Sequence, residues 1–106
     1  MTTNVTEIVN FKLINNADLA QFHIANNALQ DYLDNQPGVL YRSLAKQANT
    51  LQYVDLIYFA TPADAKRVSD AFSNNQVCQQ FAALIEKQSV QLAQYEVLSQ
   101  TACQQS

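Results

Sequence analysis

Charge and glycine are scarce in this sequence. Only 14% of its 106 residues are charged, whereas an average globular domain has about 25%. A single Gly leaves no Gly-rich phosphate-binding loop. Two cysteines, Cys78 and Cys103, are too few for a four-ligand zinc cluster or a disulfide framework. Six basic residues in a chain of net charge -3 argue against nucleic acid as a partner.

Long apolar runs are missing too. Residues 1–4 carry no basic segment, and no apolar run of about 7–15 residues follows them, so we expect no signal peptide. No stretch approaches the roughly 20 apolar residues of a membrane span. We therefore expect a cytoplasmic protein with reduced thiols, no membrane partner and one domain over residues 1–106. Its core would cover residues 5–98, followed by a polar tail over residues 99–106.

Side-chain amides take the place of the missing charge. The chain has ten Asn and fourteen Gln residues, dispersed over polar positions of periodic patterns. This distribution indicates ordinary surface positions, whereas a clustered one would favour a β-aggregating segment.

Four segments have the apolar alternation and β-branched content of strands: residues 5–13, 39–46, 51–59 and 90–98. A helix follows the first strand, with Asn15 and Asn16 as expected N-caps and Asp18 in its first turn. Its inward stripe is formed by apolar residues and one amide at three- and four-residue steps, namely Leu19, Phe22, Asn26, Leu29 and Leu33.

The segment around Pro37 and Gly38 ends this helix. A second helical segment begins with Thr61 as N-cap and Pro62 in the first position. Residues 73–75 break it in two and cap the short helix that follows. The order β-α-β-β-α-β predicts an α+β, ferredoxin-like sandwich in which helices cover one face of a four-stranded antiparallel sheet.

The middle two strands form a hairpin. If Ala48 and Asn49 make a two-residue loop, Arg42 lies directly opposite Asp55, an arrangement that opposite charges favour. The sheet face away from the helices would then carry six apolar side chains, too many to leave in water. We expect a second copy of the chain to cover this face as a homodimer. The six residues are Ile8, Leu40, Leu44, Ile57, Phe59 and Leu92.

The sequence resembles the antibiotic-biosynthesis-monooxygenase-like family of the dimeric α/β-barrel superfamily over residues 5 to 98. The segments that carry the resemblance are 7–13 (EIVNFKL), 36–44 (QPGVLYRSL), 54–59 (VDLIYF) and 90–98 (VQLAQYEVL).

The resemblance implies two sheets packed face to face in a dimer, with a ligand cavity between sheet and helices. The better-known relatives oxidise aromatic polyketides or haem without a flavin or metal centre of their own, which implies no cofactor and no metal here. Asn10 matches a functional Asn of the family's first strand, and Phe59 replaces a Trp at the end of the third. Residues 77–85 lack the His of the haem-binding members, so we do not expect this protein to bind or degrade haem.

Arg42 and Asp55 are the most informative polar pair. A carboxylate beside a cation suits a general base and an anion-stabilising group, whereas the structural alternative is an ion pair that bridges two strands. His23 is a candidate base because its ordinary pKa lies near neutrality, and its alternative is a boundary residue with one hydrogen bond. Asn10 is a candidate for holding substrate oxygen, or else a rim amide.

Ten aromatic residues offer both core and pocket material. Tyr53 and Phe59 share the strand face of Asp55 and are therefore the expected pocket-lining aromatics, and Gln94 of the last strand reaches the same face.

Three functions remain open at this point. The first is a small cofactor-independent monooxygenase that acts on an apolar or aromatic, enolisable small molecule. The second is a non-catalytic, ligand-binding or stress-related dimer, and the third is an isomerase or lyase on the same scaffold.

Overall fold

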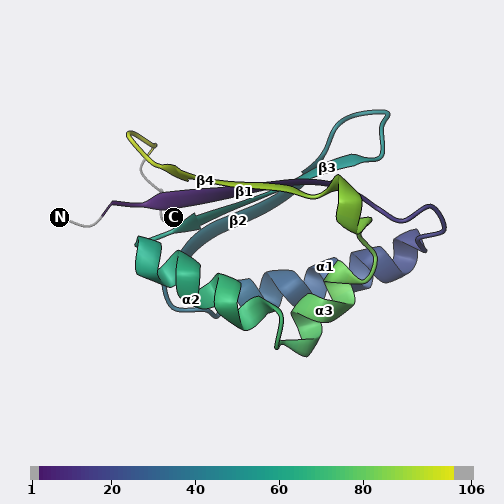
Figure 1. Ribbon diagram of the computed structural model, residues 1–106, viewed down its shortest axis with the longest axis horizontal. Coiled ribbons are helices and arrows are strands. Elements are labelled where there is room, and N and C mark those ends of the chain that lie inside the picture. The colour runs from purple at the N-terminus through teal and green to yellow at the C-terminus, as the bar shows by residue number, and fades with distance from the viewer. Residues whose placement is uncertain (1–2, 102–106) are drawn as a thin grey trace.

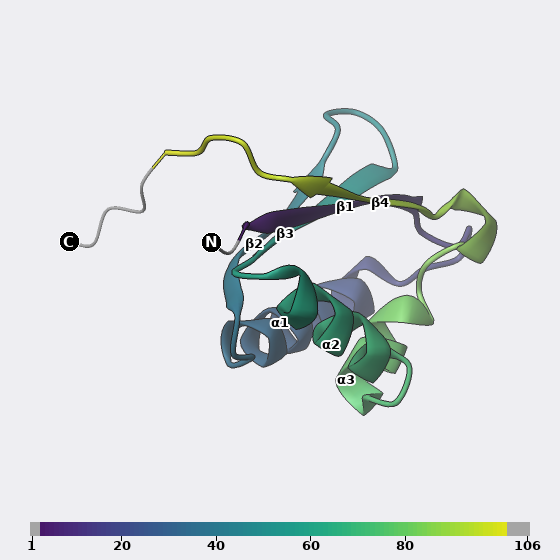
Figure 2. The same cartoon turned by 60° about the vertical axis from the view of Figure 1, so that its left-hand side comes forward.

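The computed structural model describes residues 3–101 and has the predicted ferredoxin-like fold (Figure 1). Its elements in chain order are β1 (Val5–Lys12), α1 (Leu19–Asp34), β2 (Val39–Lys46), β3 (Gln52–Phe59), α2 (Pro62–Phe72), α3 (Gln76–Ala82), a 3-10 turn (Lys87–Ser89) and β4 (Gln91–Glu96). The strands form one antiparallel sheet in the order β2-β3-β1-β4. All three α-helices lie against the same face of this sheet, as both views show (Figures 1 and 2).

The predicted strands and helices are all present within a few residues of their expected ends. Residues 102–106 of the expected polar tail, with Cys103, lie outside the described residues, as do Met1 and Thr2 of the segment searched for a signal peptide. Between residues 3 and 101, no helix combines the length and apolar character that a membrane span requires.

The predicted N-cap of α1 is wrong. Asp18 caps the helix, because its Oδ1 accepts hydrogen bonds from the backbone N–H groups of Ala20 (2.9 Å) and Gln21 (3.3 Å). Asn15 and Asn16 lie in a turn instead, closed by a hydrogen bond from the N–H of residue 17 to the carbonyl of residue 14. This turn moves the N-cap two to three residues beyond the predicted positions.

The other predicted helix signals are confirmed. Thr61 caps α2, Pro62 opens it and Asn75 caps α3. Gly38 adopts a φ of +86°, and a Cβ there would lie 2.1 Å from Cγ of Asp64. Glycine is favoured in this turn because the backbone is left-handed, and any other residue would also have to displace the Asp64 side chain.

The predicted hairpin register is wrong by two residues. The backbone N–H of Gln47 donates to the carbonyl of Gln52 at 2.9 Å, so the loop spans residues 48–51 rather than two residues. Arg42 consequently lies opposite Ile57. A shift by an even number leaves every side chain on its face, so Arg42 still shares a face with Asp55.

The predicted composition of the uncovered sheet face is also largely wrong. Ile57 and Phe59 are buried beneath the helices, Leu44 packs against that core, and Leu92 lines a cavity on the same side. Of the expected set, Ile8 alternates with the inward Glu7 and Val9 and therefore does face away from the helices. The error arises because both faces of β3 are apolar. The alternating sequence pattern divides the residues into two faces, but it does not indicate which face the helices cover.

We call the face away from the helices the outer face. Residues paired across an antiparallel sheet share a face, and the observed register therefore assigns to the outer face Thr6, Ile8, Tyr41, Val54, Leu56, Tyr58, Ala93 and Tyr95.

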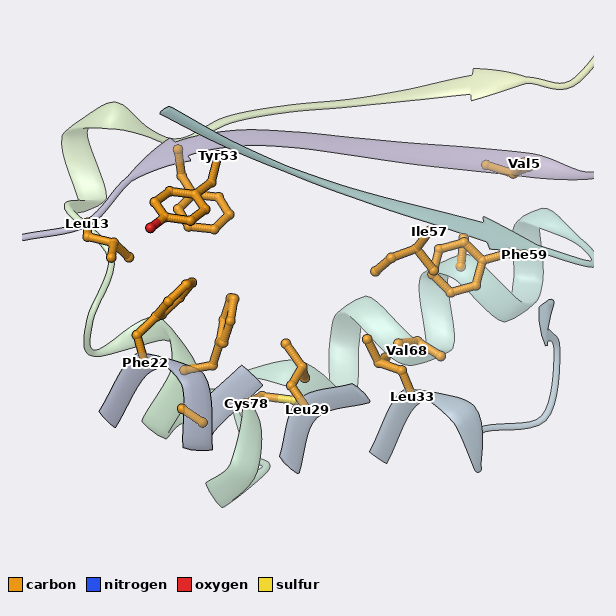
Figure 3. Close-up of a cluster of buried hydrophobic side chains, with 14 residues drawn as sticks. Val5, Leu13, Phe22, Leu29, Leu33, Tyr53, Ile57, Phe59, Val68 and Cys78 are labelled. Carbon is orange, nitrogen blue, oxygen red and sulfur yellow. The ribbon is translucent and has the colours of Figure 1, made fainter. Parts of the chain in front are cut away.

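The core lies between the sheet and the helices. Phe11 stacks on Tyr53 with ring centroids 5.5 Å apart, and Phe22 meets Phe81 at 5.3 Å. Figure 3 shows side chains from α1 and from the sheet pointing toward one another across this layer. The aromatic cluster fills the end of the layer near the β2–β3 hairpin.

Candidate functional site

A cavity of about 300 Å³ lies between the sheet and the helices. We call it the inner cavity. Its walls are mostly apolar and come from every helix and from three strands, with four polar or charged residues among them: Val9, Phe11, Leu29, Leu33, Ile57, Phe59, Val68, Phe72, Phe81, Ala82, Ile85, Val90 and Leu92, together with Glu7, Asp55, Ser69 and Lys87. An apolar wall with a few polar groups is the usual composition of a small-molecule site.

The cavity opens beside β4. Four of its lining residues are exposed, namely Ser69, Lys87, Val90 and Leu92, and they belong to α2, the 3-10 turn and β4 with the residue before it. β4 is an edge strand of the sheet. The opening of the cavity therefore lies between this edge and α2.

Arg42 and Asp55 form a buried ion pair at the side of the cavity. Nε of Arg42 donates to Oδ1 of Asp55 at 2.9 Å, and Nη2 donates to Oδ2 at 2.7 Å. The Nη1 group donates to Asn26 at 2.7 Å and to Gln30 at 3.2 Å, both on α1. The guanidinium also lies 5.6 Å from the ring centroid of Phe81. Every nitrogen of this guanidinium is thus engaged within the protein.

Glu7 is a second buried carboxylate in the same cavity, and the sequence reasoning missed it. Its side chain is reached by Nε2 of Gln94 at 2.9 Å and by Oγ of Ser69 at 3.4 Å, and both bonds end on Oε2. Among residues 3–101, no Lys, Arg or His nitrogen lies within 4 Å of this carboxylate. Glu7 therefore differs from Asp55, whose charge Arg42 balances.

A signal for Glu7 was present in the sequence. It occupies an inward position of β1, in phase with Val5, Val9 and Phe11, where an apolar residue is expected. A charged residue at such a position is rarely buried without a functional or pairing reason.

The structure brings some of the predicted site residues together. Asp55 and Phe59 line the inner cavity, Arg42 stands behind Asp55, and Gln94 touches Glu7 on the same face. Tyr53 belongs to the aromatic cluster and is not among the residues that line this cavity.

Two predicted residues lie away from the cavity. His23 is exposed on α1, on the solvent side of the helix whose buried residues include Phe22 and Ala25. Asn10 is on the outer face, where it lines a separate hollow of about 310 Å³ with Tyr53 and hairpin residues. Neither side chain is positioned to meet a molecule bound in the inner cavity.

Cys78 is buried on α3 beneath α1 and is not part of the cavity wall. Burial raises the pKa of its thiol to about 11. Because the thiolate is the nucleophile, a thiol with this pKa is unreactive near neutral pH.

Comparison with known proteins places the fold. The chain is similar to SnoaB, a cofactor-independent oxygenase from Streptomyces nogalater, at 16% identity and a TM-score of 0.76, over 93% of this chain and 96% of that one. It is also similar to a dimeric ferredoxin-like protein of unknown function from Jannaschia sp. CCS1 (14% identity, TM-score 0.68, 89% of this chain and 99% of that one).

A third similar structure is a candidate antibiotic biosynthesis monooxygenase from Chloroflexus aurantiacus J-10-fl (13% identity, TM-score 0.66, 93% of this chain and 97% of that one). No protein-family model matches the sequence, and no curated protein matches it. The predicted resemblance to this group is confirmed for the fold. At sequence identities this low, structural similarity shows the fold and not the function.

Proposed function

We propose that the protein is a small cofactor-independent monooxygenase that acts on an apolar or aromatic, enolisable small molecule. The observation that carries the proposal is the inner cavity, which is apolar, open at one edge and provided with buried carboxylates. The similarity in fold to a cofactor-independent oxygenase supports it. A flat molecule of two or three fused rings suits a volume of about 300 Å³ with walls of this composition.

The chemistry needs a base and dioxygen. A carboxylate removes a proton from a CH₂ group next to a carbonyl, and the electron pair of that C–H bond becomes the enolate. The enolate gives its electrons to dioxygen and forms a C–O bond. The peroxide anion takes the proton back from the carboxyl group, and the resulting hydroperoxide loses water. The balance is CH₂ plus O₂ to C=O plus H₂O, so dioxygen is the only oxidant.

Of the two bases that the sequence predicts, Asp55 and His23, Asp55 is the one that lines the cavity. Arg42 holds both oxygens of this carboxylate and so fixes its position at the side of the cavity. The roles predicted for His23 and Asn10 would need a ligand on the helix surface or on the outer face, so the cavity favours its own buried carboxylates, Asp55 and Glu7, as candidate bases.

The proposal includes a cytoplasmic homodimer joined through the outer face. Tyr41 and Tyr95 are each more than half exposed there, at 53% and 54%. Around them lie the apolar residues Ile8, Val54 and Leu56 of the two central strands. A patch of this kind is rarely left in water, and a similar structure is described as dimeric.

The test is oxygen uptake with anthrone after dialysis against a chelator. We expect uptake by the wild type and little change in His23→Ala, with circular dichroism to verify folding. Saturable binding of anthrone without any turnover would instead support the non-catalytic binding protein. Conversion of a substrate without oxygen consumption would support an isomerase or lyase.

A further inference from the structure

We propose that Glu7 is the group that binds and deprotonates the ligand in the inner cavity, and that the ligand is a neutral hydroxylated arene or its keto form. This inference deepens the proposed function and depends on it for the reaction, though not for the binding. It assigns to Glu7 the role of base that the sequence prediction gave to Asp55 or His23.

The hydrogen bonds of Glu7 leave one oxygen available. Gln94 and Ser69 both donate to Oε2, while Oε1 accepts no hydrogen bond from the described residues. Oε1 is also not fully buried. Among residues 3–101, Thr6 Oγ1 is the one fully buried side-chain nitrogen or oxygen that lacks a hydrogen bond. Since Glu7 lines the inner cavity, this free oxygen is accessible from the ligand space.

Asp55 has no such capacity. Each of its oxygens receives a short bond from Arg42, at 2.9 and 2.7 Å, and its negative charge is balanced within the protein. Transfer of a proton to Asp55 would require that this bidentate pair be broken. Glu7 has only the neutral donors of Gln94 and Ser69, so it can accept a proton without breaking an ion pair.

The charged residues of the cavity wall favour a neutral ligand over an anionic one. Lys87 is the one cationic lining residue in the described part of the chain, and it is exposed at the opening. A carboxylate or phosphate on the ligand would therefore face Glu7 without a buried cation to balance it, and would be repelled. A hydroxyl group, by contrast, donates a hydrogen bond to Oε1, and bonds to a charged acceptor are the stronger kind.

The proton transfer is balanced within the site. In the keto form, the proton of the CH₂ group moves to Oε1 of Glu7, and the electron pair of the C–H bond becomes the enolate. Glu7 becomes a neutral carboxylic acid, so the net charge of the site does not change.

The test measures dissociation constants of three fluorescent probes: 2-naphthol, 2-methoxynaphthalene and 2-naphthoate. We expect the wild type to bind 2-naphthol about tenfold more tightly than 2-methoxynaphthalene, because only the former donates to Oε1, and to bind 2-naphthoate most weakly. Glu7→Gln should bring the naphthol-to-methoxynaphthalene ratio close to one. Glu96→Gln is the matched control, because Glu96 is an exposed β4 carboxylate outside the cavity wall, and it should keep the wild-type ratio.

Equal wild-type affinities for naphthol and methoxynaphthalene would overturn the assignment, and so would 2-naphthoate binding as tightly as 2-naphthol. These wild-type measurements need no variant, so a Glu7→Gln protein that fails to fold leaves them valid. Oxygen uptake with anthrone separates this inference from the proposed function. Probe selectivity without uptake removes the oxygenase and retains Glu7 as the binding group. Uptake that persists in Glu7→Gln removes Glu7 as the base and retains the oxygenase.

Discussion

The guanidinium of Arg42 meets the carboxylate of Asp55 through two parallel hydrogen bonds, although the two residues are not opposite one another in the sheet. Arg42 pairs with Ile57 across the ladder, and Asp55 pairs with Leu44. The pair thus runs diagonally between β2 and β3 beneath the helices, with side-chain exposures of 0% and 9%. It links two strands to α1 and forms one side of the inner cavity. Its removal should therefore lower the free energy of unfolding, whatever its effect on activity.

Arg42→Met should lower the free energy of unfolding by about 3–5 kcal/mol, because it leaves a buried carboxylate without its partner. Arg42→Met combined with Asp55→Leu should recover most of that loss, since both buried charges are then gone. Urea unfolding at neutral pH measures both effects. Lys66→Ala, which removes a fully exposed pair with Asp70, is the control and should change little. A double variant no more stable than Arg42→Met would contradict this account of the pair.

Filling the cavity should weaken ligand binding without a large loss of stability. Val68 lines the cavity from α2, and Val68→Phe would place its added ring atoms in that space. We expect 2-naphthol to bind at least tenfold more weakly, and the free energy of unfolding to change by less than about 1 kcal/mol. Ala65→Leu is the contrast, because Ala65 is 1% exposed on the same helix and outside the cavity wall. It should destabilise by about 1–3 kcal/mol through overpacking, and equal stability losses in the two variants would argue against an open cavity.

The proposed dimer predicts a mass in solution of twice the 11.9 kDa chain. Leu56→Asp places a charge at the centre of the outer face and should shift sedimentation equilibrium toward the single-chain mass. Ile24→Asp is the matched control: Ile24 is 61% exposed on α1, away from the sheet, and this variant should remain dimeric. A wild type that sediments as a single chain would contradict the dimer.

The fold could be predicted because its signals are local. Thr61 before Pro62, Asn75 as a cap and Gly38 after Pro37 each specify an element boundary through their own backbone chemistry. The hairpin register could not be predicted, because the turn contains no Gly and Asn49 alone takes the left-handed conformation, at φ 64°. Two-residue and four-residue loops were equally compatible with that sequence.

The site was harder to predict than the fold, because it depends on which sheet face the helices cover. β3 is apolar on both faces, so the Arg42–Asp55 pair was found while its surroundings were assigned to the wrong side. Glu7 could not be predicted from charge pairing, because its partners are neutral. They are the amide of Gln94 and the hydroxyl of Ser69, which are distant in sequence. His23 was predicted as a base from its side-chain chemistry alone. Its position along α1 places it on the solvent side of the helix.

The corrected N-cap of α1 predicts unequal effects of two substitutions. Asp18→Ala should lower the free energy of unfolding by about 1 kcal/mol, because the N–H groups of Ala20 and Gln21 lose their acceptor. Asn16→Ala should have little effect, since Asn16 is exposed in the preceding turn. Chemical denaturation of both variants decides between the two caps, and a larger effect at Asn16 would restore the cap predicted from sequence.

The buried thiol of Cys78 predicts a loss of stability at alkaline pH. Burial raises its pKa from an ordinary 9.0 to about 11 in the folded protein. The unfolded chain therefore loses this proton first, so the folded state holds more protons between these two values and the free energy of unfolding falls as pH rises from about 9 to about 11.

The fall in the free energy of unfolding should be shallower in Cys78→Ala. Both proteins should carry Cys103→Ser, which removes the second thiol from the comparison. Tyr32, whose pKa is raised by burial and then by the nearby Cys78 thiolate, keeps part of the slope above pH 10 in either protein. Urea unfolding at steps from pH 8 to pH 11 measures the difference, and parallel curves for the two proteins would show that the Cys78 thiol ionises as easily in the folded state as in the unfolded one.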